Sequence, residues 1–465
     1  MLTRLEIDGF KNILGLIVDF GPYTCIAGPN AVGKSNIFDA ISFLSLLADM
    51  TFVEAATRVR GEISSISDPR TLFYEGADGD TLPMRLAAEM LLPLEVEDDF
   101  GRQARPTSSF VRYELELGFE APRSATGRAT GRIVLRREEL TYITSGDAAA
   151  HLRWPHSKKL FRDRVVVNKK KGKAFISTTT EGDEGVVNVH QDGGSRGQPR
   201  KSPASRAPRT VVSTTTTSDD PTILTVRREM QQWRTLALEP SAMRTPDSAS
   251  DPSQIEANGA HLAAALFRLQ TDLGSEAMAE VAAASSALTD VRDISVDYDQ
   301  QRETLTLLAR IGHGSPLPAR ALSDGTLRFI ALCIINIDPS YGGVVCMEEP
   351  ENGIHPARIQ AMVELVRGLA VDADAEPGPE NPLRQVVVNT HSPAFVQYQH
   401  ADDVLLAMPT RIARDGTRMT TVRLLPLADT WRARATGQSI SRATIADYLT
   451  ELPDAQLRLD FEKAG

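Results

Sequence analysis

Cysteine is scarce in this chain, and its placement excludes two kinds of stabilised scaffold. Cys25, Cys333 and Cys346 are far apart among the 465 residues, and each lies inside an apolar run. The sequence has no paired cysteines and no closely spaced Cys/His ligands, so it predicts neither a disulfide framework nor a structural zinc site. The pattern is typical of buried thiols in a reducing compartment.

Long apolar runs are also missing. No stretch approaches the roughly 20 apolar residues that span a bilayer, and the first residues lack the charged and apolar segments of a secretory signal. We therefore expect a cytoplasmic protein without a membrane partner. Hydrophobic residues still make up 42% of the chain, which is enough for a sizeable core, and the length predicts two or three domains.

A positive net charge is lacking as well. The formal net charge is -10 at pH 7, so DNA or RNA would have to bind to a local basic patch. The lysine-rich turn at 169–173 and the arginines of 178–222 are two such patches, although a solvated loop is the simpler interpretation of each. Because 178–222 is rich in Gly, Ser, Thr and Pro and poor in large apolar residues, we expect a mobile loop there.

The most informative stretch that is present runs from 28 to 41, GPNAVGKSNIFDAI, and matches G-x4-G-K-[ST]. It follows an apolar run and precedes a segment with helical apolar spacing, so strand, phosphate loop and helix N-terminus come in the required order. Backbone N–H groups of such a loop point at phosphate oxygens, the lysine adds a positive charge, and the hydroxyl binds Mg²⁺. The expected nucleotide contacts are Gly28, Pro29, Asn30, Ala31, Val32, Gly33, Lys34, Ser35 and Asn36, with Ser35 also a magnesium ligand.

Residues 2–20 precede this loop and alternate apolar and polar side chains in two short runs, which predicts a β-hairpin. Phe10, Lys11 and Asn12 in its turn lie where the base or ribose of a nucleotide could be contacted. An ordinary hairpin turn with a solvated lysine is an equally good interpretation. We carry Lys11 forward as a candidate nucleotide contact.

A second group of candidate residues lies nearer the C-terminal end. Ser323 precedes an apolar helical pattern and is its predicted N-cap, which leaves N–H groups of the first turn free to bind an anion. Asp324, Gly325 and Thr326 form that first turn. An N-cap by itself is an ordinary structural feature, so this motif gains meaning only beside the others.

Two apolar strand patterns follow, and each ends in side chains that can do chemistry. Glu348 and Glu349 follow VVCM, and His391 comes just after QVVVN. Strands of this kind deliver such residues to the carboxyl edge of a sheet, where ligands bind in open α/β folds. One glutamate can hold the Mg²⁺ shell, the other can orient the attacking water, and the histidine can hydrogen-bond a γ-phosphate. Taken singly, a surface glutamate pair and a structural histidine are the plainer explanations.

The combination GPNAVGKS, LSDGTLR, MEEPENGIHP and NTHSP resembles the ABC-type, SMC- and RecF-like ATPases, and in particular bacterial AAA-family ATPases of the OLD-like group. The resemblance implies an ATPase head whose copies trap ATP and Mg²⁺ between them, as a homodimer or higher oligomer. Gly28–Ser35 would be the Walker A loop and Ser323–Gly325 the signature motif, which reaches the nucleotide of the opposite subunit.

The resemblance also assigns roles to the acidic residues. Glu348 takes the Walker B position, where many relatives have Asp, so a contact to Mg²⁺ through water is implied. Glu349 is the implied catalytic carboxylate and His391 the switch histidine, acting with Lys34. Asn352, Gly353 and His355 lie where the D-loop of this family meets the dimer seam.

We therefore expect an α/β fold, an ABC-type P-loop NTPase head with an inserted β-rich and helical region. Residues 1–50 are the expected first part of the head and 51–224 the β-rich insertion with its mobile loop. Residues 225–289 are the expected helical subdomain, and 290–465 the second part of the head.

Three functions are compatible with these motifs. The first is a regulatory ATPase of a phage-defence system of the abortive-infection type, which controls a separate effector; the residues after His391 lack the glycine and DxD pattern of a TOPRIM nuclease. The second is a RecF- or SMC-like clamp that binds DNA in an ATP-dependent way, although no long heptad run predicts a coiled-coil arm. The third, a transporter subunit, is disfavoured by the SDG signature and the large insertion.

Overall fold

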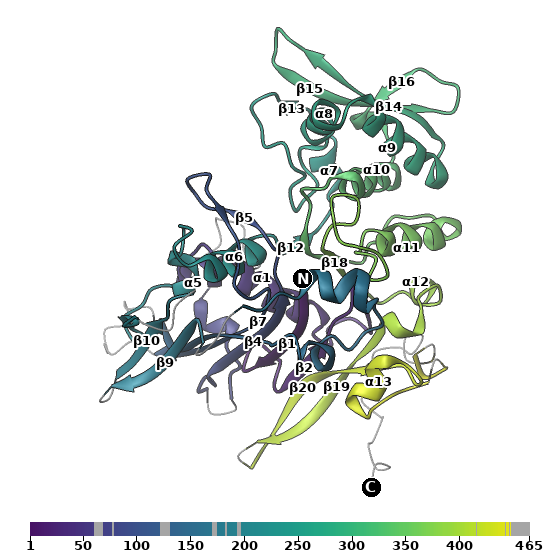
Figure 1. The fold of residues 1–465 in the computed structure, drawn as a ribbon. Coiled ribbons are helices and arrows are strands. Elements are labelled where there is room, and N and C mark those ends of the chain that lie inside the picture. The colour runs from purple at the N-terminus through teal and green to yellow at the C-terminus, as the bar shows by residue number, and fades with distance from the viewer. Residues whose placement is uncertain are drawn as a thin grey trace, which may run out of the picture.

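Two β-sheets form the framework of the molecule (Figure 1). The computed structural model describes residues 1–59, 68–76, 79–120, 131–169, 174–181, 184–192, 197–414, 416–441, 443–445 and 447. The first sheet has the order β12-β17-β18-β3-β19-β20, with β20 antiparallel to β19 and the other neighbours parallel. Its strands are β3 (Tyr23–Ala27), β12 (Arg234–Leu236), β17 (Gly343–Glu348), β18 (Arg384–Thr390), β19 (Val404–Arg414) and β20 (Thr417–Pro426).

Side chains of the central strands alternate between two cores, one on each face of this sheet. Cys346 of β17 packs in the core that contains α1 (Lys34–Leu46), whereas Met347 packs in the core that contains α8 (Leu262–Leu273) and α10 (Asp324–Ile337). A parallel strand that is covered on both faces needs a continuous apolar run, because successive side chains point to opposite faces. This explains the uninterrupted VVCM and VVV segments, and the expected α/β fold is confirmed.

The second sheet is antiparallel and has the order β11-β10-β9-β8-β7-β4-β1-β2. The hairpin predicted at 2–20 is confirmed, because β1 pairs with β2. β1 also pairs with β4, so the N-terminal hairpin and the expected insertion share one sheet rather than lying in two separate units. The strands are β1 (Leu2–Asp8), β2 (Leu16–Asp19), β4 (Met84–Leu91), β7 (Phe110–Glu120), β8 (Arg132–Tyr142), β9 (Ile176–Glu181), β10 (Glu184–Val189) and β11 (Arg200–Pro203).

The loop expected at 178–222 contains regular structure, so that prediction is wrong for the residues described there. Most of β9, all of β10 and β11, and α5 (Val211–Thr214) lie in it, while 182–183 and 193–196 are outside the described residues. Val187 and Val212 are buried, and backbone pairing extends the sheet through polar segments whose side chains need no core. Composition alone missed this because a strand needs backbone partners more than apolar side chains.

A helical lobe extends from one face of the first sheet, with which it shares a core, and lies at the top of Figure 1. It packs α8, α9 (Ser275–Leu288) and α10 against a small sheet in which β14 and β15 form the hairpin predicted at 290–311. The expected boundary at 289/290 therefore passes through this lobe. Its strands are β13 (Asp247–Ser248), β14 (Val291–Asp299), β15 (Thr304–Ile311) and β16 (Pro316–Pro318).

The remaining elements connect or cover these units. α6 (Pro221–Gln231) packs beside α1, so it belongs to the sheet side rather than to the helical lobe. None of the helices in the described ranges is long and apolar enough to cross a membrane. The other helices and strands are α2 (Phe52–Arg58), η1 (Pro69–Leu72), β5 (Val96–Glu97), β6 (Gln103–Ala104), α3 (Ala148–His151), η2 (Lys158–Arg162), α4 (Asp163–Val165), α7 (Pro240–Met243), η3 (Ala319–Ala321), η4 (Pro356–Arg358), α11 (Ile359–Gly368), α12 (Pro393–Val396), η5 (Ala401–Asp403) and α13 (Trp431–Thr436).

Candidate nucleotide site

The phosphate-type loop joins the end of β3 to the start of α1, as its sequence predicts. Gly28 has φ 157° and Gly33 has φ 108°. A Cβ at Gly28 would lie 2.8 Å from the carbonyl oxygen of Ala407, and a Cβ at Gly33 would lie 2.6 Å from Nδ2 of Asn12. Glycine is therefore required at both positions by backbone conformation and by close contact.

Lys34 lies inside the curl of this loop rather than in solvent. Its side chain is buried, and Nζ donates to the carbonyl oxygens of Gly28 and Pro29 at 2.6 Å each. Burial lowers the pKa of Lys34, while the nearby carboxylates of Glu349 and Glu348 act in the opposite direction. The ammonium is thus desolvated and aimed along the loop, where phosphate oxygens can replace the two carbonyls.

The turn of the N-terminal hairpin contacts this loop directly. Asn12 donates from Nδ2 to the carbonyl oxygen of Val32 at 3.4 Å and accepts from Nδ2 of Asn36 at 2.7 Å. The sequence suggests Asn12 as a contact to a base or ribose. In the structure its side chain stabilises the loop through these two hydrogen bonds. Lys11 donates to Asp39 of α1 at 2.7 Å, so it lies beside the same helix, and its contact to nucleotide stays a prediction.

Glu349 and His391 are brought together, as expected for side chains at the ends of adjacent strands. Oε1 of Glu349 lies 2.5 Å from Nδ1 of His391, and Oε2 accepts from Nδ2 of Asn352 at 2.7 Å. The backbone of Glu349 has φ 46°, and its N–H donates to the carbonyl oxygen of Asn389 at 3.0 Å. Both carboxylate oxygens of Glu349 therefore have a hydrogen-bond partner. Its backbone conformation lies outside the β region, so the chain turns away from β17 at this residue.

Glu348 ends β17 and is exposed beside Glu349. It lines a pocket of about 320 Å³ together with Glu349, Asn352, Arg328 and Leu236. Hydroxyl and carboxylate oxygens are the donors that Mg²⁺ prefers, so Glu348 and Ser35 at the start of α1 have the right chemistry for that ion. Their role as metal ligands stays a prediction.

Glu351 is a further acidic residue that the sequence did not single out. Only 7% of it is exposed, it accepts a hydrogen bond from Oγ1 of Thr390, and burial raises the pKa of its carboxyl group. Its Oε2 has no hydrogen-bond partner among the described residues. The signal in the sequence was the position of Glu351, the third glutamate of the MEEPE segment, just after an apolar strand. A buried carboxylate near a lysine and a histidine is often part of a functional site.

The signature segment opens α10 with the predicted cap. Oγ of Ser323 accepts from the N–H of Thr326 at 3.3 Å, and Asp324 forms an ion pair with Arg244 at 2.5 Å. A Cβ at Gly325 would lie 3.5 Å from the carbonyl oxygen of Gly353. In Figure 1 α10 belongs to the helical lobe, apart from α1 and its phosphate loop.

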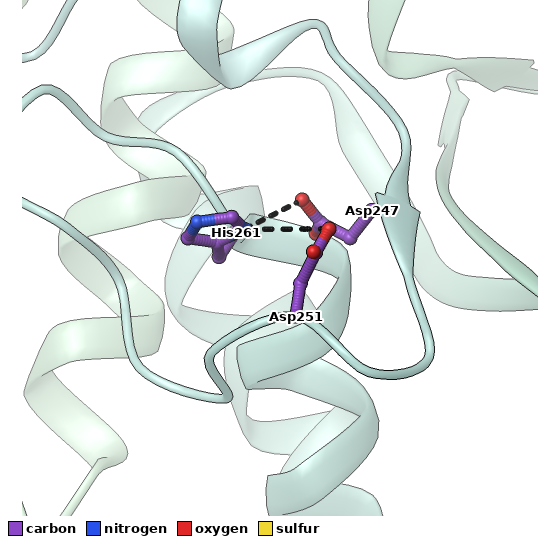
Figure 2. A group of neighbouring side chains, drawn as sticks. All are labelled: Asp247, Asp251 and His261. Atoms are coloured by element: carbon purple, nitrogen blue, oxygen red, sulfur yellow. Dashed lines mark hydrogen bonds and ion pairs between the residues drawn. The ribbon is translucent and has the colours of Figure 1, made fainter.

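A cluster of Asp247, Asp251 and His261 has the donor atoms of a metal site, but its hydrogen bonds explain it structurally (Figure 2). Nδ1 of His261 lies 3.1 Å from Asp247 and 3.9 Å from Asp251. The second oxygen of Asp247 accepts from the N–H of Ala264 at 2.9 Å in the first turn of α8. These contacts stabilise the turn into α8, and we assign no metal ion to them.

Comparisons with known proteins show what this chain is similar to. The family model described as "AAA domain, putative AbiEii toxin, Type IV TA system" matches residues 149–397, which includes the signature, both glutamates and His391. A segment of 121 residues is 51% identical to structural maintenance of chromosomes protein 1 of Schizosaccharomyces pombe. That match covers 25% of this chain and 8% of the relative, so the chain spans a small part of that protein.

Solved structures of SMC heads are similar over most of the chain at low identity. A head bound to the C-winged helix domain of ScpA has 13% identity and a TM-score of 0.45, with 92% of this chain and 98% of that chain covered. The head from Thermotoga maritima has 11% identity and a TM-score of 0.38, with the same coverage. The Pyrococcus furiosus head, bound to the C-terminal domain of ScpA, has 11% identity and a TM-score of 0.41. The match covers 90% of this chain and 96% of that chain.

The family match rests on more than half of the 465 residues and includes the segments that build the acidic half of the site. Residues 28–35 lie before the matched range, so their role as a phosphate loop stays a prediction that rests on their own motif and geometry. The chain therefore belongs to the family that this model describes, the AAA domains of the putative AbiEii toxin type.

Proposed function

We propose that the chain binds ATP with Mg²⁺ and hydrolyses it between two copies of itself. The observation that carries the proposal is the arrangement around Glu349. Its carboxylate is held by His391 and Asn352 at the sheet edge where the phosphate loop begins, and its charge acts on Lys34. Phosphoryl transfer to water needs mainly positioning and charge neutralisation, and these residues supply both.

Each group has a defined task in this reaction. Lys34 and the loop N–H groups bind the phosphates, and Glu349 orients and deprotonates the attacking water. His391 donates to Glu349 or to the γ-phosphate, depending on which ring nitrogen holds the proton. Ser35 and Glu348 would hold Mg²⁺, which neutralises charge on the β and γ phosphates when it is bound. Ser323 and the first turn of α10 would bind the nucleotide of the opposite copy.

The first test is steady-state ATP hydrolysis by the wild-type chain and by Lys34→Ala. We expect turnover in the wild type and a loss of nucleotide binding and turnover in the variant, because the loop loses its one buried cation. A variant that binds and hydrolyses ATP normally would place the nucleotide elsewhere. Lys159→Ala, which removes an exposed lysine of η2, is the matched control and should leave turnover unchanged.

For the biological role we propose a regulatory ATPase of a phage-defence system that controls a separate effector, such as a nuclease. The family description, which names an abortive-infection toxin, supports this role. The match to an SMC protein instead favours a clamp that binds DNA when ATP is bound. We expect a cytoplasmic homodimer or higher oligomer in either case.

One experiment separates these two roles. Glu349→Gln should retain ATP and hold the copies together, because the base is lost while the phosphate contacts remain. Native mass spectrometry of this variant from its own host, with ATP and Mg²⁺, should show a second polypeptide or copurified nucleic acid if the chain controls an effector. A bare dimer that binds added duplex DNA with steep salt dependence would support the clamp.

A further inference from the structure

Arg328, in the second turn of the signature helix, connects that helix to the catalytic side of its own chain. Arg328 lies on α10, and its Nη1 donates to the carbonyl oxygen of Asn352. A Cβ at Gly353 would lie 3.7 Å from the same nitrogen. The guanidinium therefore packs on the 349–354 turn that follows Glu349, rather than extending into solvent.

This turn also fixes the carboxylate of Glu349. The N–H of Asn352 donates to the carbonyl oxygen of Glu349 at 3.0 Å, and its side-chain amide donates to Oε2 of Glu349 at 2.7 Å. Arg328 binds the peptide group of Asn352 on the other side. A shift of α10 would thus move the residue that holds one oxygen of the catalytic carboxylate.

The surroundings of Arg328 show that it is not an ordinary surface cation. Burial lowers the pKa of its guanidinium, and its Nε has no hydrogen-bond partner among the described residues. Asp324, one turn earlier on α10, forms its ion pair with Arg244 instead. Partial burial of a guanidinium with an unmet N–H is costly. The hydrogen bond to Asn352 and the nearby charge of Asp324 offset part of that cost.

We propose that Arg328 is a positioning residue that couples the two nucleotide sites of a dimer. It would transmit movement of the signature segment, which meets the partner's nucleotide, to Glu349, which acts on the nucleotide bound by its own chain. The proposal rests on the proposed ATPase function and names a residue through which one site regulates the other. It assigns Arg328 no contact with nucleotide.

The test compares Arg328→Met, which keeps the length of the stem without its donors, with Arg328→Lys, which keeps a charge and a donor. For Arg328→Met we expect kcat for ATP hydrolysis to fall about tenfold with KM changed less than about twofold. Arg328→Lys should recover part of the loss. Arg320→Met, which removes an exposed arginine just before the same helix, is the matched control and should behave as wild type.

A second measurement separates positioning from a direct role of the signature helix in dimer closure. In a Glu349→Gln background, ATP should still drive dimer formation when Arg328 is replaced by Met, as followed by light scattering. Loss of that ATP-dependent dimer, a rise in KM without a fall in kcat, or an unchanged kcat would each overturn the proposal. The thermal unfolding midpoint of each variant checks that it is folded.

A double-mutant cycle with Asn352→Ala tests whether both residues act through Glu349. The Ala variant keeps the backbone carbonyl that Arg328 contacts but removes the amide that holds Oε2. We expect the double variant to lose less kcat than the product of the fold-losses of the two single variants. Fully independent effects would contradict the proposed connection. An inactive wild-type chain, in contrast, would refute the ATPase function itself.

Discussion

At the scale of single residues, Gly33 shows how the phosphate loop depends on a neighbour that the motif does not contain. Asn12 of the N-terminal hairpin occupies the space that a Cβ at Gly33 would need. The same amide holds Val32 and Asn36. The loop therefore keeps its curl through a brace from another element as well as through its own glycines.

For Gly33→Ala we expect ATP affinity to fall by at least about tenfold, because φ 108° is strained for alanine and Asn12 must move. Titration with a fluorescent ATP analogue measures the change in Kd. Gly368→Ala is the matched control, since a Cβ at that position in α11 meets nothing within 4 Å. Equal affinity of Gly33→Ala and wild type would show that the bound loop has another conformation.

Glu349 illustrates a second property of single residues at this site. A non-glycine residue with positive φ is strained, and such strain is retained where the surroundings determine the conformation. Here the hydrogen bond from the N–H of Glu349 to Asn389 and the contacts of its side chain with His391 and Asn352 hold this conformation. If Glu349 is the catalytic carboxylate proposed above, these contacts would pre-position it and reduce the reorganisation that the reaction requires.

At the scale of elements, a buried carboxylate connects the antiparallel sheet to α5. Glu138 of β8 is fully buried and accepts from the N–H groups of Val211 and Val212 and from the hydroxyl of Tyr113. Burial raises the pKa of Glu138 to about 7, from an ordinary value of 4.5. The segment that we had expected to be mobile is thus tied to the sheet at this point.

This pKa predicts a pH dependence of stability. Between about pH 4.5 and 7 the folded chain holds a proton on Glu138 that the unfolded chain has released, so stability falls as the pH rises through this range. The total effect is at most about 3 kcal/mol. In Glu138→Gln the side chain does not titrate. The thermal unfolding midpoint of the wild type, measured relative to that of the variant, should therefore fall as the pH rises from 5 to 8.

Glu139→Gln is the control for this comparison, because Glu139 lies on the opposite face of β8 and pairs with Arg137 at 2.7 Å. It should follow the wild-type dependence on pH. If Glu138→Gln also follows it, the carboxyl group of Glu138 is ionised in the folded state throughout, held by its two backbone donors.

The elements that the sequence predicted correctly are those with a local cause. The alternation in 2–20 predicted the first hairpin, and the apolar runs before Lys34, Glu348 and His391 predicted buried strands. The strands of 178–222 were missed because most of their side chains are polar, although β9 and β10 pair with each other across a short connection. Arg328 was missed for a different reason, since its contact with Asn352 spans 24 residues and leaves no local pattern.

At the scale of the whole molecule, the two halves of the proposed site lie in different parts of one chain. The phosphate loop and Glu349 belong to the sheet, whereas the signature segment opens a helix of the lobe. A chain built in this way can complete two sites by pairing with a second copy, each copy giving its loop to one site and its signature segment to the other. The nucleotide would then control whether the copies stay together.

This arrangement predicts complementation between two inactive variants. Lys34→Ala destroys the site that uses its own phosphate loop, and Ser323→Arg destroys the site that uses its signature segment, so each should be inactive as a homodimer. A mixed dimer keeps one site intact, with the loop from the Ser323→Arg copy and the signature from the Lys34→Ala copy. With random pairing, an equimolar mixture should recover about one quarter of the wild-type ATPase rate, because half of the dimers are mixed and each has one working site.

Mixtures of each variant with wild type calibrate subunit exchange. Absence of recovery despite exchange would mean that each chain completes its own site, and Arg328 would then act within one site instead of between two.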